Sequence, residues 1–251
     1  MDEFYGIIAI GIVVAVGLYL VFWFPKVVKG WIDAFKKRLP VRHYATTESQ
    51  QVMNEMEPGA LNVLLLYMNG FNRKMSTHRD IVTPAFLKEA YFPETDTFDP
   101  DVPFETMIEY FDNDYPNRPG IKSYFFDSME RLSDGSIAVG TSRLYHSGGT
   151  SRIRYIVTQN SVTGHWYMDH IARNFTGTLI DRFETSRGTQ MYVLEFEEDS
   201  YLLYETANNV PGVQVGDFIY AEGYLVTDEE LDGSPYYRLT QMHRLEQEIA
   251  V

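Results

Sequence analysis

An uncharged stretch near the start of the chain, Phe4–Phe24, limits its possible folds more than any other feature. A helix of these 21 residues would be about 31 Å long, which matches the hydrocarbon core of a bilayer. A cleaved signal peptide needs a basic start and a small-residue cleavage site, whereas this chain begins Met-Asp-Glu and the stretch ends in large aromatic residues. The sequence therefore predicts an uncleaved transmembrane helix over residues 1–24.

A basic segment follows this stretch. Residues 25–42 carry a net charge of +5, and the apolar residues Val28, Trp31, Ile32, Phe35 and Leu39 repeat with helical spacing. The pattern predicts a short amphipathic helix at the membrane interface, and the alternative is a frayed topology signal. The expected membrane-interface residues are Trp23, Lys26, Lys29, Trp31, Phe35, Lys36, Lys37 and Arg38.

The position of this basic segment also predicts the orientation. Positive residues concentrate on the cytoplasmic side of a span, so we expect a single-pass protein of the inner (cytoplasmic) membrane with its N-terminus outside and its body in the cytoplasm. A periplasmic body is the alternative. We assign residues 25–57 to the amphipathic helix and a linker.

The next segment, 58–173, has the pattern of an α+β domain. Apolar periodicity predicts helices over 58–75, from Pro84 to about Tyr91, and over 103–111. Alternating strands follow over 122–132, 137–146, 151–159 and 165–172, and Gly-rich turns separate them. This order predicts about three helices followed by four antiparallel strands.

Three motifs in this segment carry a family resemblance: Tyr67–Arg73, Thr83–Leu87 and, above all, Thr163–Ile171. The last motif has a turn Gly, then Trp166 and Asp169. Residues 60–172 resemble the nuclear-transport-factor-2-like superfamily, which implies a cone-shaped α+β fold. Enzymes of that superfamily place Asp, Tyr or His inside the cone.

Residues 174–251 have an all-β pattern, with five expected strands over 175–185, 190–197, 201–206, 217–227 and 236–245. The motif Val215–Leu225 has a Gly-Asp turn and a mid-strand Gly223, and it resembles the fourth strand of oligonucleotide/oligosaccharide-binding folds. We therefore expect a small β-barrel domain, with an extra sheet layer on the first domain as the alternative. The predicted fold class is a single N-terminal transmembrane helix, an α+β cone-like domain and a small all-β barrel.

The charge distribution argues against nucleic acid as a partner. Residues 43–251 carry a net charge of −17, and residues 174–251 alone carry −11, so a phosphate backbone would be repelled. The chain has no cysteine, which removes thiolate metal sites and cysteine nucleophiles. We expect no metal and no cofactor.

The sequence offers few residues for catalysis. The cavity candidates are Asp127, His146, Tyr167 and Asp169, and an Asp169–Tyr167 pair could transfer a proton. The simpler alternative is that these groups lie on a solvated face.

We therefore expect a protein that is not an enzyme. The prediction is a membrane-anchored accessory or scaffold subunit that contacts lipid and assembles a membrane-protein complex of the photosynthetic, respiratory or secretion type. The alternative is a membrane-anchored small-ligand receptor or enzyme that uses the cone cavity.

Overall fold

The computed structural model describes residues 23–91, 102–185, 188–197, 200–206, 210–227 and 235–245. In this part of the chain the helices are α2 (Phe24–Arg38), α3 (Thr47–Glu55), α4 (Pro58–Gly70), the 3-10 helix η2 (Met75–Ile81), α5 (Pro84–Tyr91) and α6 (Phe104–Asp114). The strands are β1 (Arg42–His43), β2 (Ile121–Arg131), β3 (Ile137–Tyr145), β4 (Thr150–Gln159), β5 (Trp166–Glu184), β6 (Gln190–Glu197), β7 (Ser200–Thr206), β8 (Phe218–Thr227) and β9 (Pro235–Arg244).

The helices begin where the local sequence predicts them. Pro58 and Pro84 lie in the first turns of α4 and α5, where a missing N–H costs nothing. The Thr83 hydroxyl caps α5 by accepting a hydrogen bond from the backbone N–H of Phe86. The predicted helix over 58–75 ends earlier than expected, at Gly70, and the chain then forms η2.

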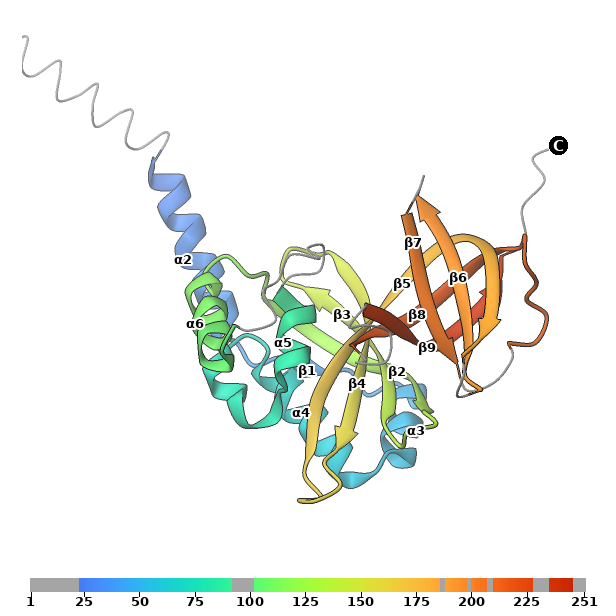
Figure 1. Cartoon of the computed structure of the whole chain (residues 1–251). Coiled ribbons are helices and arrows are strands. Elements are labelled where there is room, and N and C mark those ends of the chain that lie inside the picture. Colours follow the sequence, from blue (N-terminus) through green and yellow to red (C-terminus); the bar gives the residue numbers. More distant parts are fainter. Residues whose placement is uncertain are drawn as a thin grey trace, which may run out of the picture.

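The first half of the body is a sheet covered on one face by helices. Its strand order is β1-β2-β3-β4-β5; β1 runs parallel to β2, and the other neighbours are antiparallel. Helices α3 to α6 lie on one side of this sheet (Figure 1). The space between is a packed core whose largest members include Tyr67, Phe86, Phe126, Tyr155 and Trp166.

The second half is a ring of five strands. Strand β5 pairs with both β6 and β8, and the order β5-β6-β7-β9-β8 returns to β5. The pair β7–β9 is parallel, and the others are antiparallel. Its interior is filled by apolar and tyrosine side chains, among them Leu179, Tyr192, Leu194 and Tyr204.

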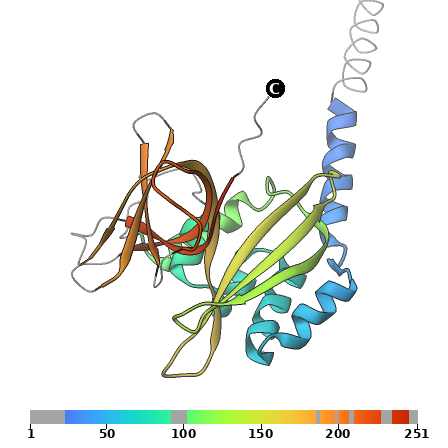
Figure 2. The ribbon, with the colours of Figure 1, turned by 90° about the vertical axis from the view of Figure 1, so that its right-hand side faces the viewer.

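The long strand β5 joins the two halves. Its first part pairs with β4 over Trp166–Ala172, and its second part pairs with β6 and β8 from Arg173 onward. Figure 2 shows the sheet and the ring side by side, connected through this strand. The outer face of the first sheet also packs on β8, where Ala138 and Ile156 contact Tyr224.

The predicted fold class was wrong. In the described residues, no helix is long and apolar enough to cross a membrane. Of the predicted span, only Trp23 and Phe24 are described, and its other residues lie outside the described part. In the part of the chain that the structure describes, the strands form one nine-stranded mixed sheet with six short helices, in place of an anchored cone followed by a separate small barrel.

The described residues therefore do not support the prediction of a single-pass transmembrane protein. The predicted separate β-barrel is also wrong, because the ring of strands shares β5 with the first sheet. The expected domain boundary between residues 173 and 174 falls inside β5. The physical reason is that no Gly or Pro interrupts β5 between its two pairing regions, so one strand can serve both sheets.

Candidate functional site

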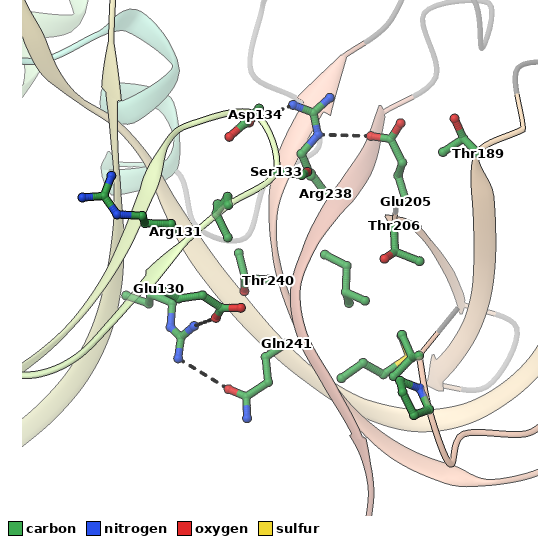
Figure 3. A pocket seen from close by; sticks show the side chains of 16 residues that line it. Glu130, Arg131, Ser133, Asp134, Thr189, Glu205, Thr206, Arg238, Thr240 and Gln241 are labelled. Carbon is green, nitrogen blue, oxygen red and sulfur yellow. Dashed lines mark hydrogen bonds and ion pairs between the residues drawn. The ribbon is translucent and has the colours of Figure 1, made fainter. Parts of the chain in front are cut away.

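A polar cleft of about 820 Å³ lies between the two halves of the body. On one side is the turn between β2 and β3, and on the other are β7 and β9 (Figure 3). The lining residues are mostly polar, with both signs of charge: Glu130, Arg131, Leu132, Ser133, Asp134, Arg154, Thr189, Glu205, Thr206, Val210, Pro211, Arg238, Leu239, Thr240, Gln241 and Met242. This volume is in the range of small-ligand pockets.

Arg238 holds the upper part of the cleft together. Its Nε donates to Glu205 Oε2 at 3.1 Å and its Nη1 donates to Asp134 Oδ2 at 3.2 Å, as Figure 3 shows. The hydroxyl of Tyr224 donates to the same Asp134 oxygen at 2.9 Å. Burial opposes ionisation of Asp134, but hydrogen bonds from Ser136 and Tyr224 and the charge of Arg238 outweigh it and lower the pKa of this carboxyl.

Arg154 pairs with two carboxylates, Glu222 and Glu130, at the base of the cleft. Its Nε lies 2.7 Å from Glu222 Oε1, and both side chains are nearly buried. Its Nη1 donates to Glu130 at 3.2 Å, and the hydroxyl of Thr240 donates to Glu222 at 3.1 Å. The charged groups of the cleft therefore pair across the junction, and they stabilise the contact between the halves.

This arrangement offers little chemistry. The residues that line the cleft include no histidine, and their carboxylates face arginines rather than a nucleophile. Over the described ranges, no group of three or more His, Asp or Glu side chains is placed to hold a metal ion. The cleft is best understood as a polar junction.

A second cluster lies under the helices, on the covered face of the first sheet. Arg143 on β3 is buried, and its Nη1 donates to the hydroxyl of Tyr155 at 3.1 Å. The ring of Tyr67 packs at 5.6 Å from that of Tyr155, and the Arg143 guanidinium lies 5.2 Å from the centre of the Phe71 ring. This cluster combines a buried cation with phenol groups.

A third feature is the pair Glu89 and His170, which links α5 to β5. Glu89 Oε1 lies 2.8 Å from His170 Nδ1, and the backbone N–H of Ile171 donates to the other oxygen. Burial alone would lower the pKa of His170, but the hydrogen bond and charge of Glu89, with the charge of Asp169, raise it. The pair is therefore a charged contact at the centre of the body.

The four predicted cavity residues do not meet in one site. Asp127 lies on the outer face of the sheet, where Arg152 pairs with it at 2.9 Å. His146 lies in the turn after β3, and Tyr167 and Asp169 lie on β5. Within the described structure, no hydrogen bond, ion pair or ring contact joins any two of the four. The proposed Asp169–Tyr167 pair stays without such a contact.

The surroundings of Asp127 and His146 explain their pKa shifts. Burial would raise the pKa of Asp127, but hydrogen bonds from Arg152, Ser142 and Ser128 lower it. Burial and the charges of Lys36 and Lys122 lower the pKa of His146. Both groups have structural causes for their shifts, and neither faces a cavity with a reaction partner.

The predicted interface residues lie on or next to one helix. The sequence predicted a short amphipathic helix within residues 25–42, and α2 confirms a helix there, because it runs from Phe24 to Arg38. Trp23, Lys26, Lys29, Trp31 and Phe35 are exposed, and Lys36 is half-buried. Of Lys37 and Arg38, only the backbone is described.

Two features of these sites were missed from the sequence. Arg143 occupies an inward position in the alternating strand Ile137–Tyr145, and a charge at an inward position is a usable signal for a special buried group. Glu89 and His170 are 81 residues apart, and their pairing depends on the packing of α5 against β5, which no local pattern encodes.

Comparisons with known proteins add no family to these observations. No family model matches the chain, and no curated protein matches it in sequence. The resemblances to the nuclear-transport-factor-2-like superfamily and to oligonucleotide/oligosaccharide-binding folds therefore stay predictions.

Proposed function

We propose that the protein is a non-catalytic accessory or scaffold subunit that joins a larger protein assembly through α2. The observation that carries this proposal is the apolar face of α2. Trp31 is 78% exposed and Phe35 is 65% exposed, and Ile32 beside them is also exposed. Contiguous apolar surface of this kind marks a site where another surface binds.

The chemistry of α2 favours an apolar groove on a partner protein. An amphipathic helix binds such a groove by inserting side chains spaced three and four residues apart, as Trp31 and Phe35 are. Lys26 and Lys29 are exposed on the same helix, so acidic side chains at the rim of the groove would complement it. Trp is the residue type most often found at the energetic centre of an interface.

The body supports a non-catalytic role. Its cleft pairs its own charges across the junction. The acidic composition of residues 43–251 makes nucleic acid an unsuitable partner. The two halves of the body are joined by a shared strand and by ion pairs, and a body held together in this way suits a scaffold.

The test uses the full chain with a C-terminal affinity tag, expressed in its native cells. We expect one partner to co-purify in constant stoichiometry under mild conditions. The double variant Trp31→Ser/Phe35→Ser should weaken this association at least about 100-fold, because two buried aromatic anchors each contribute about 2 kcal/mol or more. The matched control is Val162→Ser, which removes an exposed apolar residue from the turn before β5.

The controls make the outcomes distinct. The circular dichroism spectrum of the double variant should equal that of the parent, because neither side chain contributes to a core. Equal recovery of the partner with the parent and the double variant would refute attachment through α2. Purification of the chain as a monomer under all mild conditions would refute the subunit role itself.

A further inference from the structure

The guanidinium of Arg143 is a buried cation with no carboxylate partner among the described residues. Arg143 is 7% exposed. Its Nε donates to the hydroxyl of Ser151 and its Nη1 donates to the hydroxyl of Tyr155, both at 3.1 Å. Both acceptors are neutral. Buried charges in proteins are normally paired with an opposite charge, so this position calls for an explanation.

A second arginine lies close to the first. The guanidinium carbon of Arg118 is 5.5 Å from the centre of the Phe71 ring, and that of Arg143 is 5.2 Å from the same centre. Arg118 also lies over Phe111 at 5.1 Å. In the part of the chain that the structure describes, Arg118 forms no ion pair, and its guanidinium lies over these two rings. Both cations therefore lie against one aromatic ring, and neither has an ion-pair partner among the described residues, although like charges repel.

Two phenol groups complete the cluster. Tyr67 and Tyr155 are buried, and their rings are 5.6 Å apart in an edge-to-face arrangement. Burial raises the pKa of both phenols, so they remain protonated hydrogen-bond donors at neutral pH. Among the described residues, the Tyr67 hydroxyl makes no hydrogen bond.

The surrounding surfaces are aromatic. Phe71 and Tyr145 each lie under the Arg143 guanidinium, at 5.2 and 5.5 Å from its central carbon. Phe71, Tyr145 and Arg118 are only half-buried, so the cluster reaches the protein surface at this edge. A ligand that enters there would meet cationic donors and the faces of aromatic rings together.

We propose that Arg118, Arg143 and the hydroxyls of Tyr67 and Tyr155 form a binding site for a small organic carboxylate. A guanidinium presents a planar fork of N–H donors that fits the two oxygens of a carboxylate. The phenol donors supply further hydrogen bonds, and the rings of Phe71 and Tyr145 suit an apolar or aromatic body on the ligand. This site is independent of α2 and goes beyond the scaffold role.

Phosphate is the alternative source of an oxyanion, and the structure favours it less. A phosphate carries more charge and has no apolar body, whereas the wall of this cluster is formed mainly by rings. A carboxylate on an aromatic ring uses both the cations and the rings. Benzoate is therefore the probe, and inorganic phosphate and neutral benzamide are the comparison ligands.

The experiment is a calorimetric titration of the full chain with the three compounds. We expect saturable one-to-one binding of benzoate with a Kd below about 1 mM, and binding of benzamide and phosphate at least about tenfold weaker. Arg143→Gln should abolish binding, but this variant removes a buried group and can fail to fold. Arg118→Gln alters a half-buried residue, should keep the fold, and should weaken benzoate binding about tenfold or more, because a lost charge-assisted hydrogen bond has that effect.

Arg152→Gln is the matched control. It also replaces an arginine, but Arg152 lies on the outer face of the sheet and pairs with Asp127. It should leave benzoate binding unchanged within about twofold. Equal affinity for benzoate and benzamide, no effect of Arg118→Gln, or no benzoate binding up to about 10 mM would each overturn the proposal. Tighter binding of phosphate than of benzoate would overturn the carboxylate assignment.

Discussion

Removal of the charge of Glu89 should destabilise the body in a pH-dependent way. The side chain of Glu89 is 4% exposed and that of His170 is 16% exposed, and they are joined at 2.8 Å. Asp169 lies 3.9 Å from the other ring nitrogen of His170, and the ring of Tyr224 packs at 4.8 Å from the imidazole. This environment holds a protonated imidazole against a buried carboxylate.

The pH dependence follows from the direction of the His170 shift. Its pKa in the folded state is raised above 6.5, because Glu89 and Asp169 outweigh the effect of burial. A group with a raised folded pKa stabilises the fold below its unfolded pKa, and this contribution is lost as the pH rises through the folded pKa. The contribution of the pair to stability is therefore full well below pH 6.5 and decreases as the pH rises through the raised folded pKa.

The loss in the free energy of unfolding depends on whether His170 stays charged in the variant Glu89→Gln. Loss of one partner of a buried ion pair costs about 3–5 kcal/mol, but histidine can lose its proton and avoid part of that cost. We expect a loss of about 3 kcal/mol in the free energy of unfolding at pH 5.5. The loss should be smaller at pH 8.5 and should approach about 1 kcal/mol once the ring is neutral, because a hydrogen bond to the neutral ring is then the main loss.

The assay is urea unfolding followed by far-UV circular dichroism at both pH values. Glu105→Gln is the control, because Glu105 pairs with Arg79 and both side chains are exposed. It should cost less than about 1 kcal/mol, with little change between the two pH values. An equal loss for Glu89→Gln at pH 5.5 and 8.5 would refute the reasoning, because the loss would then not depend on titration of His170 between the two pH values.

Three further variants test how the body is held together. Gly177→Ala should lower the free energy of unfolding by more than about 2 kcal/mol in urea, because the new Cβ would lie 2.1 Å from a backbone oxygen of β6; an unchanged midpoint would contradict this close approach. Asn72→Ala should cost about 2–4 kcal/mol and speed amide exchange at Ile121, because the buried Asn72 amide bonds both the N–H and the C=O of that residue at 2.8 and 2.7 Å; unchanged exchange would count against this role. Glu222→Ala should cost about 3–5 kcal/mol because it leaves Arg154 only the more exposed Glu130 as a partner, and the double variant Glu222→Leu/Arg154→Leu should recover most of it; no recovery would show that the pair itself, rather than its isolated charge, stabilises the junction.

Local signals in the sequence predicted the elements well. The strands expected over 122–132, 137–146 and 190–197 match β2, β3 and β6 within one residue at each end. They match because turn glycines mark their ends: Gly135 and Gly148 flank β3 and Gly188 precedes β6, and all three have positive φ, at 85°, 92° and 82°. The amphipathic period of residues 25–39 likewise predicted α2.

These local signals did not predict which strands pair with one another. Residues 165–172 and 175–185 were predicted as two strands in two domains, whereas β5 is continuous through Arg173 and Asn174. Strand pattern reports which side of a strand is buried, and it does not report which strand lies next to it. The change of partner along β5 is a tertiary property, and so is the contact between Glu89 and His170.

The continuity of β5 has a consequence for the proposed role. The two halves share a strand, a buried ion pair and an apolar contact, so the body behaves as one unit and any partner that positions one half positions the other.

The link between α2 and the body is different, because the helix ends at Arg38 and Leu39 is extended with ψ 141°. Val41 is buried, and the N–H of Tyr44 donates to Tyr124 at 2.8 Å, so the chain is fixed to the sheet immediately after Pro40. The joint between α2 and the body is therefore only about two residues long, and a partner that captures α2 also constrains where the acidic body lies.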